Sequence, residues 1–114
     1  MLWIKNKGVI ANGYESENGF VVKNGSTAVI QTVDSVPPYT LALRQEMLAS
    51  GILRQKDECF YQFTQDYEFS SPSAAAAALL GASINGREWW KTSDGASLKL
   101  LQERAGGESA IAGE

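Results

Sequence analysis

The stretch FSSPSAAAAALLGASINGREWW, residues 69–90, decides the fold. Its first half predicts a helix, because Ser71 is a good N-cap, Pro72 suits the first helical position and Gly81 is a typical stop. Five consecutive alanines, 74–78, have side chains small enough to let this helix lie close against a sheet. We therefore expect a short helix packed directly on strands.

The second half of the stretch predicts a turn and a strand. Asn85-Gly86 is a turn signal, and residues 87–92, REWWKT, have the aromatic content of a strand. Side chains alternate along a strand, so three of these residues share one face: Arg87, Trp89 and Lys91. With Trp90 in the core, that face is exposed and could stack an unpaired base and hold its phosphates. The alternative is a solvated face on which one tryptophan packs under its neighbours' long stems.

The N-terminal third predicts an antiparallel meander. Asn18-Gly19 lies between short apolar runs and is a strong hairpin signal, which places strands at 11–16 and 20–23. A second such pair, Asn24-Gly25, precedes a third strand at 27–33.

The rest of the chain predicts helices and a second hairpin. Residues 40–51 carry strong helix formers, an apolar stripe of Leu43, Met47 and Leu48, and Gly51 at the C-cap position. Residues 52–63 resemble two strands around a polar turn. After Asp94-Gly95, residues 96–104 predict a last strand or a short helix.

These elements indicate one α+β domain over residues 1–104, in which antiparallel β-hairpins of about five to seven short strands pack with two short α-helices. We expect residues 105–114 to be a mobile tail. A length of 114 residues, with 44% hydrophobic and 20% charged residues, fits one ordinary globular domain. No apolar run is long enough for a membrane span or a signal peptide core, so we expect a cytoplasmic protein with no membrane partner.

Composition also excludes several chemistries. The chain has no histidine, so it has no Ser-His or Cys-His pair and no histidine-based zinc site. We expect its single thiol, Cys59, to be buried and inert. A metal nuclease would have to use Asp66, Glu68 and Glu88 with Lys91, but Glu88 and Lys91 would point to opposite faces of a strand. We therefore expect neither an enzyme nor a cofactor.

The net charge of -3 and the pI near 4.9 argue against a protein that grips duplex DNA by its phosphates. Any basic patch would be small. Non-specific affinity for duplex DNA at physiological salt should be poor.

Three stretches together carry a resemblance: GYESENGFVVKNGS (13–26), LRQEMLASGIL (43–53) and SPSAAAAALLGASINGREWWK (71–91), with Asp94-Gly95 and Leu98 after them. In this combination the chain resembles the domain of unknown function 4357 family over roughly residues 11–103. The resemblance implies an accessory module, of the kind found at the C-terminus of GIY-YIG nuclease proteins or beside restriction-modification components. The third stretch is also similar to the RAMA domain, a module proposed to recognise modified DNA. No GIY-YIG motif is present in this chain.

The resemblance and the local patterns together suggest a set of nucleic-acid-binding residues: Ser71, Ser73, Asn85, Arg87, Trp89 and Lys91. The serines surround a helix start, where backbone N–H groups favour a phosphate, although Ser71 could simply cap the helix and Asn85 simply form a turn. Trp90 matches the family's tryptophan, whereas Trp89 departs from the family pattern. Arg44 matches a recurring arginine, for which an ion pair or a cap is the expected role.

The sequence thus predicts a non-catalytic recognition module whose candidate partners are DNA and a nuclease or restriction-modification protein. The alternative is a protein-interaction or structural domain that positions a nuclease partner. A basic patch around Arg87 and Lys91 would favour the first interpretation, and an exposed apolar patch would favour the second.

Overall fold

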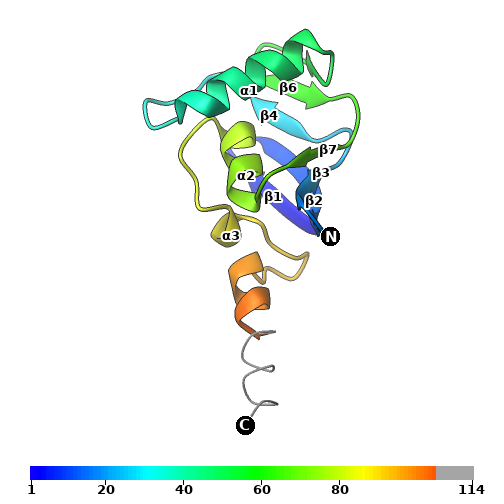
Figure 1. The fold of residues 1–114 in the computed structure, drawn as a ribbon, viewed down its shortest axis with the longest axis vertical. Helices are drawn as coiled ribbons and strands as arrows, with labels where there is room; N and C mark the ends of the chain where they lie inside the picture. The colour runs from blue at the N-terminus through cyan, green and yellow to red at the C-terminus, as the bar shows by residue number, and fades with distance from the viewer. Residues whose placement is uncertain (105–114) are drawn as a thin grey trace.

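The computed structural model describes residues 1–104, in which seven strands form two antiparallel sheets around a central helix. This is an α+β fold, as predicted (Figure 1). The tail expected from residue 105 lies outside the described residues. No helix in the described part is both long and apolar enough to cross a membrane.

The larger sheet has the strand order β1 (Leu2–Asn6), β2 (Val9–Ser16), β3 (Gly19–Val22) and β7 (Tyr67–Phe69). The predicted hairpin of β2 and β3 is confirmed, with Ser16 opposite Gly19, but its two-residue turn is Glu17-Asn18 and not Asn18-Gly19. β1 was not predicted from the sequence. It pairs with β2 through a two-residue turn, Lys7-Gly8, whose φ angles of 53° and 83° suit a tight hairpin. As a result β1 is an outer strand of this sheet.

The smaller sheet has the order β4 (Thr27–Val29), β6 (Phe60–Phe63) and β5 (Leu53–Gln55). The predicted hairpin within residues 52–63 is confirmed as β5 and β6. The prediction that a strand at 27–33 continues the N-terminal meander was wrong. The strand is only three residues long and pairs with β6, because β7 occupies the free edge of β3.

Two buried hydroxyl groups join the sheets where β2 passes β4. The Thr27 hydroxyl accepts a hydrogen bond from the Ile10 N–H at 3.0 Å, and the Ser26 hydroxyl accepts one from the Asn12 N–H at 3.1 Å. Side chains therefore satisfy the β2 backbone where no neighbouring strand does.

The central helix, α2 (Pro72–Leu80), forms as its sequence predicts. The Ser71 hydroxyl accepts a hydrogen bond from the Ala74 N–H at 3.0 Å, and Gly81 ends the helix with a φ of 63°. Every residue from Ala74 to Leu80 is buried. A helix that is apolar on all sides is stable only when it is surrounded, and α2 contacts α1, α3 and strands of both sheets.

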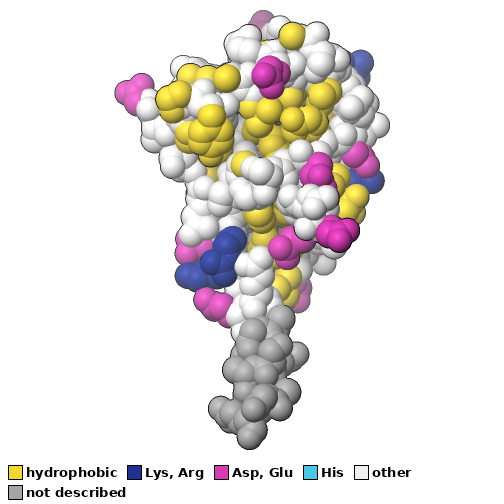
Figure 2. Space-filling model, in the orientation of Figure 1, with side chains coloured by type: hydrophobic (Ala, Val, Ile, Leu, Met, Phe, Trp, Pro, Cys, Tyr) yellow, Lys and Arg dark blue, Asp and Glu magenta, His cyan; other side chains and the backbone are white. Residues whose placement is uncertain are grey.

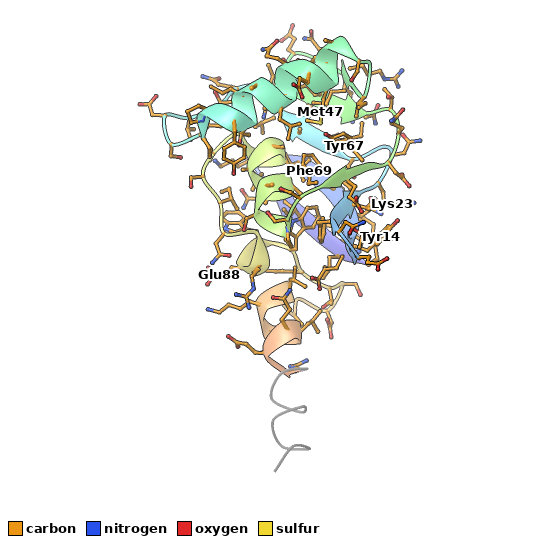
Figure 3. All side chains as sticks on the ribbon, in the orientation of Figure 1. Tyr14, Lys23, Met47, Tyr67, Phe69 and Glu88 are labelled. Carbon is orange, nitrogen blue, oxygen red and sulfur yellow. The ribbon has the colours of Figure 1, made fainter. Side chains whose placement is uncertain are left out.

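The other long helix, α1 (Pro38–Ala49), lies at the top of the view in Figure 1, beside the smaller sheet, and contacts α2 and β5. Met47 of α1 points toward the strands, and Phe69 of β7 lies beside α2 (Figure 3). Of the predicted apolar stripe, Met47 is buried, whereas Leu43 and Leu48 are half-buried. The buried face of α1 includes a charged residue, Arg44.

Arg44 holds α1, α2 and β4 together. Its guanidinium donates to the backbone carbonyl oxygens of Ala78, at 2.8 Å, Ile30, at 3.1 Å, and Val29. Burial lowers the pKa of Arg44, and the nearby Tyr61 acts in the opposite direction. Of the two roles expected for Arg44, an ion pair or a cap, the structure shows the cap, because Ala78 lies in the last turn of α2.

The strand predicted at 87–92 was wrong. Residues Gly86–Trp89 form a single helical turn, α3, and residues 98–104 are helical. The Trp90 indole N–H donates to the Pro72 carbonyl at 3.0 Å. The Trp90 ring packs on that of Phe20, with 4.4 Å between the ring centroids. Seating this side chain at the start of α2 requires the chain to curl, which overrides the strand propensity of two tryptophans. The expectation that Trp90 belongs to the core is confirmed, since it is 0% exposed.

The environment of Cys59 also differs from the expectation. This residue is exposed rather than buried, and it lies in the turn between β5 and β6. Its backbone N–H donates to the Asp57 carboxylate at 2.8 Å. The position therefore serves the turn rather than the core.

Candidate functional site

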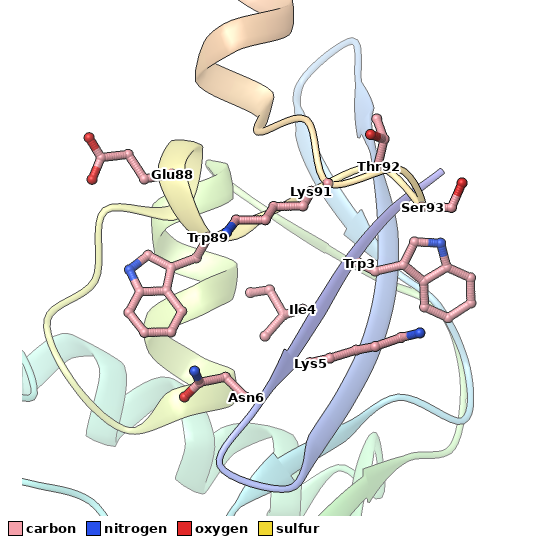
Figure 4. A pocket seen from close by; sticks show the side chains of 10 residues that line it. Trp3, Ile4, Lys5, Asn6, Glu88, Trp89, Lys91, Thr92 and Ser93 are labelled. Carbon is pink, nitrogen blue, oxygen red and sulfur yellow. The ribbon is translucent and has the colours of Figure 1, made fainter.

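An open groove of about 700 Å³ runs along the outer edge of β1 (Figure 4). Its floor is β1, from Trp3 to Asn6. One wall comes from α3, with Glu88 and Trp89, and the rim comes from the segment that follows, with Lys91, Thr92, Ser93 and Gly95.

One backbone pair holds the wall against the floor. The Trp3 N–H donates to the Lys91 carbonyl at 2.7 Å, and the Lys91 N–H donates to the Trp3 carbonyl at 2.9 Å. The pairing is an isolated bridge and does not continue as a strand. It fixes the segment after α3 beside β1, and so it fixes the position of Trp89.

The groove combines two indole rings with two ammonium groups. Trp3 and Trp89 lie on opposite sides of β1, and the Lys91 side chain extends across the groove toward Trp89 (Figure 4). On the other side, the Lys5 ammonium lies 5.4 Å from the centre of the Trp3 ring, within the range of a cation–π contact. Each side of the β1 edge thus presents an aromatic surface and a cation.

The groove is more cationic than the net charge of the chain suggests. In residues 1–104 neither Lys5 nor Lys91 forms a salt bridge. The acidic residue of the groove lining, Glu88, pairs with Lys99 at 3.5 Å, and both of these side chains are about half exposed. Such a pair is weak, and it directs the Glu88 carboxylate toward Lys99.

A comparison with protein-family models gives a match over residues 2–102, to the family described as Domain of unknown function (DUF4357). The chain belongs to this family. The match begins at residue 2, before the stretches that carry the resemblance, so the DUF4357 domain includes β1 and the whole groove. No curated protein and no solved structure matched the chain.

The predicted site residues of this DUF4357 domain fall into two groups. Trp89 and Lys91 both line the groove, although they belong to a helical turn and a bridge rather than to one strand. Arg87 lies outside the groove lining and donates to the Gln102 side-chain oxygen at 2.6 Å. Asn85 is exposed at the N-cap of α3, and its side chain makes no capping hydrogen bond.

Both predicted serines accept hydrogen bonds from backbone N–H groups of the protein at the start of α2. Ser71 caps α2, and the Ser73 hydroxyl accepts a hydrogen bond from the Gly86 N–H at 3.0 Å. The Gly86 backbone lies against the first turn of α2, so closely that an added Cβ would be 2.3 Å from the Pro72 carbonyl oxygen. The start of α2 is therefore covered by protein, which favours the capping interpretation over a phosphate site.

Sequence reasoning missed Trp3 and Lys5. A signal for them was present: apolar Leu2 and Ile4 alternate with Trp3 and Lys5 before the Lys7-Gly8 turn, the pattern of a half-buried strand. The proximity of these residues to Trp89 had no local signal, because more than eighty residues separate them in the chain.

The carboxylates considered for a metal site do not converge. Asp66 accepts hydrogen bonds from the Asn24 N–H at 2.8 Å and the Lys23 ammonium at 2.9 Å. The Asn24 N–H, followed by Lys23, lowers the pKa of Asp66. Glu68 accepts from the Ser16 hydroxyl at 2.6 Å, and Glu88 pairs with Lys99. The described residues contain no group of three acidic, cysteine or histidine side chains that could hold a metal ion.

Proposed function

We propose that this DUF4357 domain is a non-catalytic module that binds nucleic acid in the groove along β1, as an accessory to a nuclease or restriction-modification system. The supporting observation is the pairing of Trp3 with Lys5 and of Trp89 with Lys91 around one open sheet edge. Indole rings stack on bases in a sequence-tolerant way, and ammonium groups neutralise phosphates.

The small number of cations sets the expected strength and salt dependence. Two lysine contacts to a single strand predict that the logarithm of the binding constant falls with the logarithm of salt concentration with a slope of about -1.4. Stacking on one indole contributes about 1 to 3 kcal/mol per base. The domain therefore binds weakly on its own, as suits a module that acts beside a tethered catalytic partner.

The test measures binding of the full chain to labelled single-stranded, duplex and adenine-methylated duplex DNA at two salt concentrations. Trp89→Ala should weaken binding by about tenfold through lost stacking. Lys91→Ala should reduce the salt slope by about 0.7. Lys56→Ala is the matched control, because Lys56 is exposed but lies outside the groove lining. Absence of binding to all three DNAs at low salt would refute the proposal.

A second candidate function is the positioning of a nuclease partner through a protein contact. Exposed apolar side chains gather around α1 (Figure 2). In and just before this helix, Tyr39 is 61% exposed, Val33 46% and Leu41 43%. Copurification with a nuclease or restriction-modification protein of the same organism, lost in a Tyr39→Ser, Leu41→Ser variant that still binds DNA, would support this function.

A further inference from the structure

The floor of the groove is a sheet edge that is only partly paired. The Trp3 N–H and carbonyl point away from β2, because both bond to Lys91. Backbone groups on one edge of a strand recur at every second residue, so the Lys5 N–H and carbonyl point the same way, into the groove. Within residues 1–104, these two groups of Lys5 have no hydrogen-bond partner on that edge.

This edge is open over one residue only. Lys91 occupies the position beside Trp3, and the turn at Lys7-Gly8 closes the strand on the other side of Lys5. The segment around Lys91 does not extend along the edge, because α3 curls before it and the Thr92 N–H bonds to the Ala96 carbonyl at 2.8 Å. An extended peptide needs a row of such positions to add as a strand. A single donor beside a single acceptor suits a small planar group instead.

The Watson–Crick edge of a nucleobase is such a group, because each base carries a hydrogen-bond donor next to an acceptor there. In a duplex the opposite base occupies this edge, so only an unpaired or extruded base can offer it. The aromatic and cationic surfaces beside Lys5 match the faces and the phosphate of the same nucleotide.

We infer that the groove takes one unpaired nucleotide: the Lys5 backbone N–H and carbonyl bind the Watson–Crick edge of its base, Trp89 contacts the base, and the Lys91 ammonium neutralises its phosphate. This inference rests on the proposed function and specifies its ligand class as single-stranded or base-extruded nucleic acid. The readout is by backbone atoms, so it selects for an unpaired base rather than for a particular base.

The ligand-side experiment compares oligothymidine with the same oligonucleotide carrying N3-methylthymine, using the full chain and fluorescence anisotropy. The N3-methyl group removes the base donor and blocks the edge, while charge and stacking surface remain. Binding should weaken about tenfold, the effect of one to two lost hydrogen bonds. Oligodeoxyuridine is the matched control, because it lacks the thymine methyl but keeps the Watson–Crick edge, and it should bind like oligothymidine.

The protein-side experiment compares Lys5→Pro with Lys5→Ala. Both variants lose the ammonium group, but only Lys5→Pro also loses the N–H donor. Proline is tolerated on an outer strand where the N–H points away from the sheet. Lys5→Pro should bind oligothymidine about fivefold more weakly than Lys5→Ala, because the base loses the N–H donor. It should still bind the N3-methyl form more weakly than oligothymidine, because the proline carbonyl still accepts from the thymine N3–H. If Lys5→Pro does not fold, the comparison of the two oligonucleotides on the native chain decides alone.

The outcomes separate this inference from the proposed function. Equal binding of oligothymidine, its N3-methyl form and a duplex would overturn the base-edge contact and leave nucleic-acid binding in place. No binding of any oligonucleotide at low salt would overturn both. Binding of an extended peptide in the groove, with no affinity for oligonucleotides, would also overturn both and would assign the open edge to a protein ligand.

Discussion

The contact between Gly86 and the start of α2 predicts that a single added methyl group destabilises the domain and disturbs the groove. The φ of Gly86 lies outside the left-handed region, so alanine can adopt this backbone conformation. Helix propensity alone would make Gly86→Ala stabilising by up to about 1 kcal/mol. The tertiary structure predicts the opposite, because the new Cβ would lie 2.3 Å from the Pro72 carbonyl oxygen and 2.6 Å from the Ser73 nitrogen.

These are backbone atoms at a helix start, and they cannot rotate away. The clash has to be relieved by moving α3 off α2, at a cost of about 1 to 3 kcal/mol for overpacking. The shift also weakens two hydrogen bonds, from Gly86 to the Ser73 hydroxyl and from the Trp90 indole to the Pro72 carbonyl, both 3.0 Å long. Each contributes about 1 kcal/mol. We therefore expect a net loss of about 2 to 4 kcal/mol in the free energy of unfolding.

Urea denaturation, followed by near-ultraviolet circular dichroism, measures this loss. With a slope of about 1 to 3 kcal/mol per molar urea, the midpoint should fall by about 1 to 3 M. Gly95→Ala is the control: its φ of 92° strains the backbone, but an added Cβ meets no atom within 4 Å. Gly95→Ala should lower the free energy of unfolding by about 1 kcal/mol. A Gly86→Ala midpoint equal to or above that of the native chain would refute the reasoning from close packing.

Two further substitutions test the contribution of Arg44 to the interior and the pH dependence of the stability. Arg44→Leu should lower the free energy of unfolding by about 3 to 5 kcal/mol, because it removes the guanidinium donor from three carbonyl oxygens, of which that of Ala78 is bonded in a buried position and those of Val29 and Ile30 in part-buried ones. Urea midpoints should show partial recovery in Arg44→Lys relative to Arg44→Leu. The lowered pKa of Asp66 means that its contribution to stability is present above the usual carboxyl pKa near 4 and is lost as the pH falls through the folded value. Urea midpoints measured from neutral to acid pH should therefore fall less steeply for Asp66→Asn than for the native chain, and parallel curves would show that the hydrogen bonds to Asn24 and Lys23 do not matter.

Elements with short-range signals were predictable. Ser71, Pro72 and Gly81 act within their own helix, and the hairpin of β2 and β3 closes over two residues, so neighbouring residues alone specify them. The partner of β4 was not predictable in this way. A continued meander would have paired β4 with β3, but β7, about forty residues later in the chain, pairs with that edge of β3, and β4 pairs with β6. Strand order depends on which edges remain open after distant segments have packed.

In the candidate site, too, some residues could be predicted from the sequence and others could not. Trp89 and Lys91 could be selected from the sequence as an aromatic residue beside a cation, yet the strand alternation that selected them does not exist in the fold. Trp3 and Lys5 join them because Trp90 is seated on Phe20 and Pro72, and this burial brings Lys91 against β1.

The sequence by itself determined the α+β class, the β-hairpin of β2 and β3, the limits of α2 and the absence of histidine chemistry, because each depends on composition or on residues close together in the chain. Only the tertiary structure decided that residues 86–89 curl, that the start of α2 is covered and that one residue of the β1 edge stays open. The physical reason is that burying Trp90 stabilises the fold by more than local strand propensity does, and its position depends on Phe20 and Pro72, which are distant from it in the chain.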